Sequence, residues 1–337
     1  MKILVSSHRF APDIGGIETV GRLLCQEFIA AGHEVCVLTE TPSPNGHDRY
    51  QIVRQPAPGD VLKWIRWADV VFHNNISLRH AWPLTVVRRP WVAAVHTWVA
   101  RPEGTRDFRD RMKLTALSRA DVISVSSHIA NSLPFPSTVV PDPYDTEVFR
   151  MSDTSRQNDI VFVGRLVSDK GVDLLVRAIA QLRDAGITVQ TRIIGEGPES
   201  SALKELARHL GVAGQVEFTG AMQPLELAAE LCSSRMLVVP SRWSEPFGIV
   251  ALEGLACGCA VVAADGGGLV EAIGNCGLLF RRGDADHLAE QIRRVMEGKY
   301  PAPEQTALQH HLKRHSPGKV AAEYLRIFGA AIGASRS

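Results

Sequence analysis

The stretch Glu-Pro-Phe-Gly-Ile-Val-Ala-Leu-Glu at residues 245–253 is followed by three consecutive glycines at 266–268. Eight positions of helix make a little over two turns, so a helix that begins near Phe247 turns Glu253 inward and leaves Glu245 in the loop before it. The N-terminus of such a helix presents free backbone amides and positive partial charge. The stretch therefore predicts an anion site with a carboxylate on either side.

Short β-branched runs alternate with helical patterns on both sides of this stretch. In the first half of the chain, the predicted strands are residues 2–7, 34–39, 69–73, 91–96 and 121–126. In the second half they are residues 159–163, 189–194, 216–219, 236–240 and 260–264. Continuous apolar runs separated by helices are typical of buried parallel strands. The predicted fold class is α/β, with two Rossmann-like, doubly wound parallel-sheet domains.

The boundary between these domains is predicted from a polar stretch, Arg150 to Asn158, that has no apolar periodicity. We expect an N-terminal domain over residues 1–150 and a C-terminal domain over residues 156–315. A long tail from Pro301 to Ser316 then leads to an apolar helix, predicted over residues 318–334. Such a helix can pack on either domain, including back on the N-terminal one.

Length and composition narrow the class of protein. The chain has 337 residues, of which 45% are hydrophobic and 22% charged, and its formal net charge of +1 gives no reason to expect nucleic acid as a partner. Its six cysteines show no paired CxxC spacing and are predicted to be reduced thiols in the core. No segment has the length and apolarity of a membrane span or signal peptide. We therefore expect a cytoplasmic protein whose partner is a small molecule.

A glycine pair, Gly15 and Gly16, stands where the first predicted strand meets its helix. Glycines at this position let the backbone approach an anion closely. The dinucleotide fingerprint GxGxxG is not matched, because the third glycine, Gly21, comes one residue late. By itself the pair is equally well explained as a tight turn.

Two further loops follow predicted strands of the second half. Arg165 and Lys170 lie in the loop after residues 159–163, and the glycines 266–268 follow residues 260–264. Cations and glycines at the carboxyl ends of parallel strands are where phosphates bind in open sheets. Either loop alone is compatible with an ordinary solvated turn, but three such loops beside a glutamate pair indicate an anionic ligand with hydroxyls at both ends, such as a sugar nucleotide.

These residues carry a family resemblance. The motifs are Gly15-Gly16, Gly164-Arg165, Lys170-Gly171, Gly195-Glu196-Gly197-Pro198, the glutamates with seven residues between them, and the glycine run. The chain resembles the retaining GT-B glycosyltransferases of family 4, the glycogen-synthase-like and sucrose-synthase-like group. The likeness covers nearly the whole chain and is most specific over residues 239–271. It implies two Rossmann-like domains that face each other across a cleft.

The resemblance also implies roles for individual residues. Glu245 and His96 take the positions of the catalytic residues, although a lone histidine at a strand end is more often structural. Met222 falls where the family's base pocket lies. The donor-binding positions are Gly15, Gly16, Arg165, Lys170, Phe247, Gly248, Glu253, Gly267 and Gly268. Among them, Glu253 corresponds to the residue that holds the ribose, and Arg165 and Lys170 to those that hold the diphosphate.

The implied reaction moves a sugar, with retention of configuration, from a nucleoside-diphosphate sugar to an acceptor hydroxyl. UDP- and GDP-linked donors are expected, and the acceptor is left open among sugars, small natural products and lipids. No obligatory cofactor or metal is expected, because Asp284-Ala285-Asp286 is better explained as a helix cap than as a DxD metal motif. A sugar-nucleotide epimerase and a non-catalytic sugar-nucleotide-binding protein remain as alternatives.

One motif departs from the family pattern. The usual Pro-Asn-Gly-Val-Asp turn is replaced by Pro141-Asp142-Pro143-Tyr144-Asp145. The change removes a glycine near the predicted domain boundary, so the acceptor side of the site is expected to differ from that of other members.

A basic cluster precedes the predicted strand 121–126. It consists of Arg101, Arg106, Arg109, Arg111 and Lys113, with Glu103, Asp107 and Asp110 interleaved. The acidic residues dilute the positive field and favour a solvated helix face over docking on anionic lipid, which the sequence permits but does not indicate.

Overall fold

The computed structural model describes residues 1–13, 15–42, 50–99 and 107–336, and the chain divides into two compact units. The first unit comprises Met1–Pro143 together with His315–Ser337, and the second comprises Tyr144–Arg314. The polar stretch 150–158 thus lies inside the second unit rather than at the boundary. Arg156 attaches it there, because its guanidinium donates hydrogen bonds to the carbonyls of Leu231 (3.1 Å) and Cys257 (3.0 Å).

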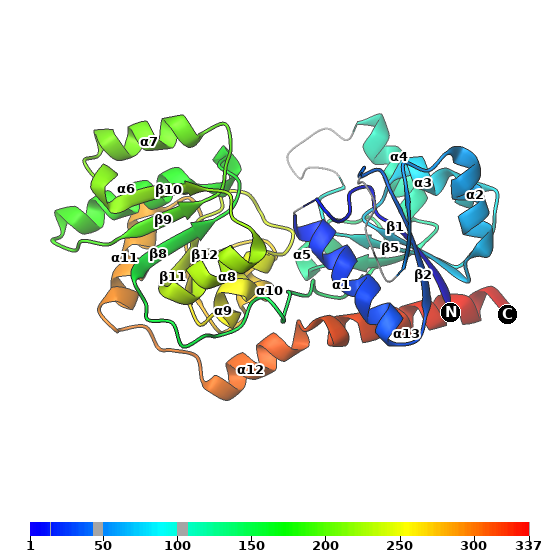
Figure 1. The fold of residues 1–337 in the computed structure, drawn as a ribbon. Coiled ribbons are helices and arrows are strands. Elements are labelled where there is room, and N and C mark those ends of the chain that lie inside the picture. The colour runs from blue at the N-terminus through cyan, green and yellow to red at the C-terminus, as the bar shows by residue number, and fades with distance from the viewer. Residues whose placement is uncertain (14, 43–49, 100–106, 337) are drawn as a thin grey trace. The chain divides into compact units, whose positions relative to one another are not determined.

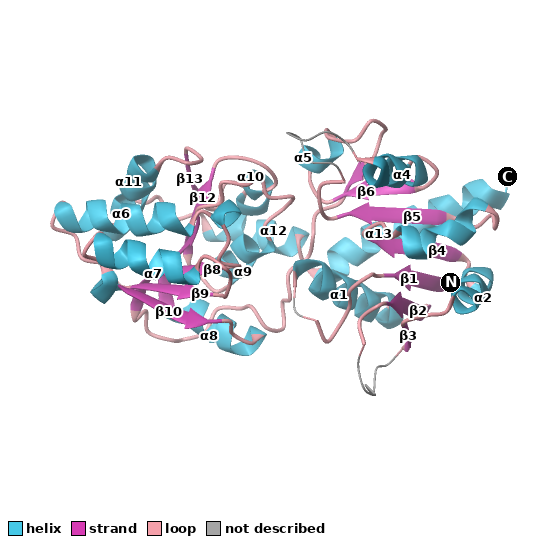
Figure 2. Ribbon diagram, turned by 90° about the horizontal axis from the view of Figure 1, so that it is seen from above, coloured by secondary structure: helices cyan, strands magenta, loops and turns pink. Residues whose placement is uncertain are grey.

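The first unit is built on a parallel sheet of seven strands within the described residues, in the order β3-β2-β1-β4-β5-β6-β7, which Figure 2 shows from above as far as β6. The strands are β1 (Lys2–Ser6), β2 (Glu34–Thr39), β3 (Gln51–Arg54), β4 (Val70–Asn74), β5 (Trp91–Val95), β6 (Asp121–Ser124) and β7 (Thr138–Val139). The helices are α1 (Gly16–Ala30), α2 (Pro58–Trp67), α3 (Leu78–Ala81), η1 (Trp82–Thr85), α4 (Phe108–Leu117), α5 (Ser127–Ala130) and α13 (Pro317–Arg336). The order runs outward in both directions from β1 and β4, as in a doubly wound fold.

The last helix, α13, returns to the first unit and packs against α1, β4 and β5 (Figure 1). Its Tyr324 and Phe328 are almost fully buried and meet Phe28 and Phe72. The ring centroid of Phe328 lies 5.4 Å from those of both Phe28 and Phe72. An aromatic cluster of this size stabilises the unit through area burial and ring packing.

The second unit holds a parallel sheet of six strands in the order β10-β9-β8-β11-β12-β13. Its strands are β8 (Asn158–Val163), β9 (Thr191–Ile194), β10 (Val216–Gly220), β11 (Ser234–Val239), β12 (Ala260–Ala264) and β13 (Leu278–Phe280). Its helices are η2 (Ser168–Lys170), α6 (Val172–Asp184), α7 (Ser200–His209), η3 (Ala213–Gln215), α8 (Pro224–Ser233), α9 (Ile249–Ala256), α10 (Leu269–Ile273), α11 (Ala285–Met296) and α12 (Gln305–Arg314). All ten predicted strands are present, so the prediction of two doubly wound parallel sheets is confirmed.

Some elements differ from the prediction. Three short strands, β3, β7 and β13, were not predicted, because two to four residues are too few to establish a pattern and the first is polar at both ends. The predicted tail 301–316 contains the helix α12, which His311 attaches to the unit by a 2.7 Å hydrogen bond to the carbonyl of Ala272. Asp284 caps α11 by accepting a hydrogen bond from the amide of His287 (2.9 Å), as predicted.

Candidate functional site

The strand order of the second unit places two loops at its topological switch point. From β8 the chain winds outward through β9 and β10, and from β11 it winds the other way through β12 and β13. The loops after β8 and β11 therefore leave the sheet side by side in opposite directions. Crevices of this kind, at the carboxyl ends of parallel strands, are where ligands bind in open α/β sheets.

Two predicted site residues meet at this point. Lys170, from the loop after β8, places its Nζ 2.6 Å from Oε1 of Glu245, which lies in the loop after β11. The hydroxyl of Ser241 donates to the same Oε1 at 2.7 Å. The side chain of Glu245 is only 12% exposed, whereas that of Lys170 is 31% exposed. The carboxylate is thus anchored and the ammonium retains access to solvent.

The glycines 266–268 support the backbone of Glu245. The amide of Gly268 donates a 2.7 Å hydrogen bond to the carbonyl of Glu245. Gly267 has a φ of +64°, and a Cβ on it would lie 2.5 Å from that same carbonyl oxygen. A side chain at this position would displace the loop, so glycine is required both for the backbone conformation and for the close approach.

Helix α9 begins directly after the Glu245 loop. Gly248 is its N-cap with a φ of +111°, and a Cβ there would lie 2.5 Å from Cδ2 of Leu269. Phe247 is buried in the core at the start of the helix. The helix begins at Ile249, two residues after Phe247, which leaves Glu245 in the loop, as predicted, and Glu253 in the second turn.

Glu253 has an unusual environment for a carboxyl group. Burial raises the pKa of Glu253 to about 8, and the carboxylate of Asp145 contributes to the same rise. Asp145 itself is buried and accepts hydrogen bonds from the amides of Glu147 (3.1 Å) and Val148 (3.3 Å). At neutral pH the unliganded Glu253 therefore carries a proton and can donate as well as accept hydrogen bonds.

Arg165 follows β8 and is exposed, and its guanidinium forms no hydrogen bond or ion pair with any residue of the described ranges. The backbone beside it is held by the neighbouring loop, since the amide of Leu166 donates to the carbonyl of Glu196 at 2.8 Å. Gly195 and Gly197 allow this approach, because a Cβ on either would lie 1.9 Å or 2.2 Å, respectively, from a backbone oxygen of the Arg165 loop. Met222 lies two residues after β10 and is partly exposed.

In the first unit, Gly15 and Gly16 stand at the start of α1, after β1. Asn74 ends β4 and reaches across to α1, where its Nδ2 donates to the carbonyl of Ile17 (3.0 Å) and to the hydroxyl of Ser7 (3.1 Å). These contacts lie at the switch point between β1 and β4. Gly21 packs on Asn74, since a Cβ there would lie 2.6 Å from Nδ2. The late glycine thus serves helix packing.

His96 follows β5 and is paired with a residue of the motif that departs from the family pattern. Its Nδ1 lies 2.9 Å from Oδ1 of Asp142, and both side chains are buried. Its Nε2 is buried and has no hydrogen-bond partner in the described structure. Because a carboxylate can only accept, Nδ1 donates to Asp142 in this contact, and the contact fixes the orientation of the ring. Tyr324 of α13 lies behind the pair, and burial, with the charge of Asp142, raises the pKa of its phenol.

A second histidine of this unit resembles a hydrolase triad in its partners. His80 contacts the hydroxyl of Ser6 through Nδ1 and the carboxylate of Glu40 through Nε2, both at 2.9 Å. Ser6 and His80 are each 1% exposed, so no substrate can reach the hydroxyl. Burial lowers the pKa of His80. This row of hydrogen bonds stabilises the ends of β1 and β2.

The structure brings together Lys170, Glu245, Gly267 and Gly268, which the sequence placed in separate loops. It adds Ser241, Asp142 and Asp145, to which the sequence assigned no role. Asp142 and Asp145 lie in the motif that departs from the family pattern, and this departure in the sequence could have identified them as candidate site residues. Ser241 has no such signal, because a serine after a strand is common in loops.

The second unit matches a known protein family almost from end to end. A family model described as "Glycosyl transferases group 1" matches residues 145–314. The chain belongs to the group 1 glycosyl transferases. The carboxyl-edge site described above lies within the matched residues.

This group 1 glycosyl transferase is similar to curated proteins named D-inositol 3-phosphate glycosyltransferase. It is 38% identical to that of Rhodococcus erythropolis over 168 residues, covering 47% of this chain and 37% of the relative. The protein of the same name from Acidothermus cellulolyticus is 38% identical over 181 residues, covering 47% of this chain and 40% of the relative. The chain thus matches well under half the length of each of these relatives.

Solved structures resemble the whole chain. A sucrose-phosphate synthase from Thermosynechococcus elongatus superimposes with a TM-score of 0.82 at 23% identity, covering 99% of each chain. HepE of Anabaena, in complex with UDP, has a TM-score of 0.81 at 21% identity, covering 98% of this chain and 100% of its own. At these identities the likeness shows the fold, which is the two-domain GT-B fold.

The described part of the chain contains no group of three or more His, Cys, Asp or Glu side chains suited to holding a metal ion. Within the same residues, none of the helices combines the length and apolarity needed to cross a bilayer.

Proposed function

We propose that this protein is a retaining glycosyltransferase that moves a sugar from a UDP- or GDP-linked donor to an acceptor hydroxyl. The observation that carries the proposal is the contact of Lys170 with Glu245 at the switch point of the second sheet. A cation with access to solvent and an anchored carboxylate, 2.6 Å apart, suit a ligand that carries phosphate next to sugar hydroxyls. Family membership supports the same reaction class.

In the proposed complex, Lys170 and Arg165 hold the diphosphate, and the N-terminus of α6 adds positive partial charge. Glu245, with the backbone amides near Phe247 and Gly248, holds the sugar hydroxyls, while Glu253 holds the ribose. His96 takes part in catalysis, and Met222 contacts the base. The donor is also bound by four glycines: Gly15, Gly16, Gly267 and Gly268.

The bond from the anomeric carbon to the diphosphate oxygen breaks, and the acceptor oxygen bonds to that carbon on the same face. The leaving diphosphate takes the acceptor proton, so that no carboxylate is needed as a nucleophile. Stabilisation of the developing phosphate charge and positioning of the sugar supply the rate.

Replacing Glu245 by alanine tests this proposal. We expect Glu245→Ala to lower the turnover of UDP-glucose or a GDP-linked hexose, read as slow donor hydrolysis, by about a hundredfold or more. Nucleotide binding should persist, because Lys170 and Arg165 remain; a thermal-shift series with UDP, GDP and ADP measures it and identifies the base. Inositol 3-phosphate is offered as one acceptor because the relatives' name mentions it.

Glu230→Ala is the matched control. Glu230 is as buried as Glu245 and is also paired with a cation, Arg192, but it lies on α8. Turnover should survive in this variant at temperatures below its melting point. Unchanged turnover in Glu245→Ala would contradict the assignment. Conversion of the donor without acceptor into an isomer would indicate an epimerase, and binding without transfer or hydrolysis would indicate a binding protein.

A further inference from the structure

One surface of the first unit exposes large apolar side chains. It is formed by residues 77–90, which contain α3 and η1, and by residues 107–120, which contain α4; we call it the α3–α4 face. Trp82 is 45% exposed, Val86 74%, Phe108 76% and Met112 43%. These are half of the large apolar side chains that the described residues expose, and α3 and α4 pack against each other. Exposed apolar patches of this kind mark interaction sites.

Helix α4 exposes two of its large apolar residues. Phe108 and Met112 are one turn apart and therefore share a face, and both are exposed. Only Leu117 of this helix is buried in the core. A surface helix normally buries its apolar stripe, as α6 does with eight buried residues. Within the described residues of the unit, Phe108 and Met112 of α4 therefore remain exposed to solvent.

The same face is strongly basic. Residues 77–90 contain three arginines and no acidic residue, although Arg79 is paired with Glu40 at 3.0 Å. Residues 107–120 contain four cationic side chains and two aspartates. The whole chain, by contrast, has a net charge of +1. The two ranges together carry a formal charge of +5, so the rest of the chain carries −4 and the positive charge is concentrated here.

The two aspartates of α4 are engaged with the backbone. Asp107 accepts a hydrogen bond from the amide of Asp110 at 2.8 Å, and Asp110 accepts one from the amide of Asp107 at 3.4 Å. Both carboxylates thus form a capping box at the positive end of the helix dipole. Four cations against two aspartates leave residues 107–120 with a formal charge of +2. Arg101, Arg106 and Glu103 of the predicted basic cluster lie outside the described residues.

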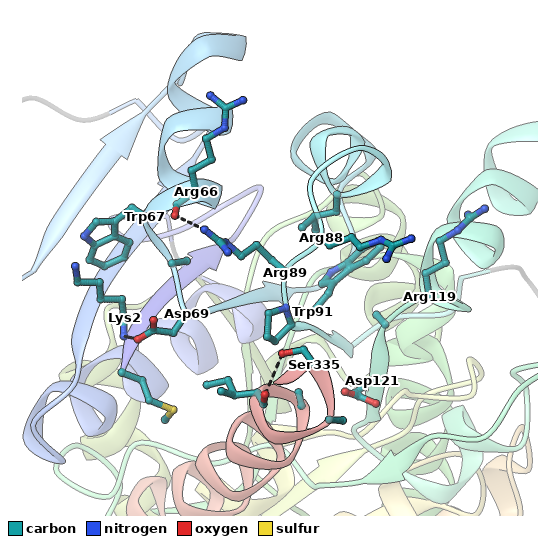
Figure 3. Close-up of a pocket in the computed structure, with 18 of the residues that line it drawn as sticks. Lys2, Arg66, Trp67, Asp69, Arg88, Arg89, Trp91, Arg119, Asp121 and Ser335 are labelled. Carbon is teal, nitrogen blue, oxygen red and sulfur yellow. Dashed lines mark hydrogen bonds between the residues drawn. The ribbon is translucent and has the colours of Figure 1, made fainter. Parts of the chain in front are cut away.

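A pocket of about 1140 Å³ shares Arg88, Arg89 and Arg119 with the two ranges that form this face (Figure 3). It lies at the amino ends of β1, β4, β5 and β6, at the opposite edge of the sheet from Gly15 and His96. Five cationic side chains line it, together with three acidic ones: Lys2, Arg66, Arg88, Arg89 and Arg119, and Glu34, Asp69 and Asp121. The guanidinium groups of Arg66 and Arg88 form no hydrogen bond or ion pair with any described residue. The pocket therefore offers unpaired cations at an edge of the sheet where the donor is not expected.

We propose that the α3–α4 face and this pocket dock the protein on an anionic lipid bilayer. Trp82, Val86, Phe108 and Met112 enter the headgroup region, and the arginines bind lipid phosphates. The positive charge of the face favours an anionic bilayer over a second copy of this chain. In a symmetric pair of copies the face would meet itself and bring like charges together. The proposal does not depend on the glycosyl-transfer reaction.

Cosedimentation with lipid vesicles tests whether the exposed apolar side chains of the α3–α4 face contribute to membrane binding. The protein should sediment with phosphatidylcholine vesicles that contain roughly one phosphatidylglycerol in three lipids, and remain in solution with pure phosphatidylcholine. The double variant V86S/F108S should bind at least about tenfold more weakly. Leu225→Ser is the matched control, because Leu225 is 73% exposed but lies on α8 of the second unit. Thermal unfolding should be the same for all three proteins.

The double variant R88Q/R119Q tests the charges. It should weaken binding by about tenfold or more, and raising the salt concentration should weaken wild-type binding in the same way. Arg177→Gln on α6, an exposed arginine outside the face, should bind as the wild type does.

Four results would overturn the proposal: no binding to anionic vesicles, equal binding to neutral ones, equal losses in the control variants, or binding that salt does not weaken. A concentration-dependent dimer that V86S/F108S abolishes would assign the face to a second copy instead.

Discussion

Glu253 shows how a single residue responds to its surroundings. Its pKa is raised to about 8 in the folded protein against an ordinary value of 4.5, first by burial and then by Asp145. Between these two pH values the folded state holds a proton that the unfolded chain has released. The free energy of unfolding therefore falls as pH rises across this window, by up to about 1.4 kcal/mol per pH unit, and is level above it.

This sign gives a direct test. In Glu253→Gln the contribution of Glu253 disappears, so the difference in unfolding free energy between wild type and variant should change steadily from about pH 5 to about pH 8. Chemical denaturation of both proteins across this range measures it, and subtraction removes the pH-dependent contributions that the two proteins share. A constant difference would mean that Glu253 is ionised in the folded protein.

The glycines of the loop between β12 and α10 position a residue of another loop. Gly267→Ala must place a Cβ 2.5 Å from the carbonyl of Glu245 at a φ of +64°. We expect a loss of stability of about 2 to 5 kcal/mol from the left-handed backbone and the clash together. Calorimetry measures the loss, and nucleotide binding should weaken with it.

Gly298 separates these two causes. It has a φ of +68°, and no atom lies within 4 Å of the place that a Cβ would take. Gly298→Ala therefore carries only the backbone cost of about 1 to 2 kcal/mol. Equal losses in the two variants would show that the contact with Glu245 is not required.

At the scale of the whole molecule, the last helix of the chain completes the first unit. Phe328 is fully buried against Phe28 and Phe72, so Phe328→Ala should destabilise this unit by about 3 to 5 kcal/mol. Of the six tryptophans, only Trp243 lies in the second unit, so tryptophan fluorescence mainly reports the first. Its unfolding transition should move to lower denaturant in Phe328→Ala and stay in place in Leu225→Ala. An unmoved transition would mean that α13 adds little to the stability of the unit.

Local features could be predicted from the amino-acid sequence: the ten main strands, the loops that follow them, and the positions where glycine or a cap is needed. These depend on the periodicity of side chains and on backbone conformation, which neighbouring residues set. Four elements were not predicted: the strands β3, β7 and β13 and the helix α12. The strands have too few residues to show a pattern, and α12 is too polar to show one.

Contacts between residues that are distant along the chain could not be predicted and are known from the folded structure. Lys170 pairs with Glu245 although 75 positions separate them, and His96 pairs with Asp142 across 46 positions. The return of α13 to the first unit and the α3–α4 face are of the same kind. Such contacts depend on the order of strands in a sheet and on which helix face remains uncovered, and both follow from how the whole chain packs rather than from any segment of it.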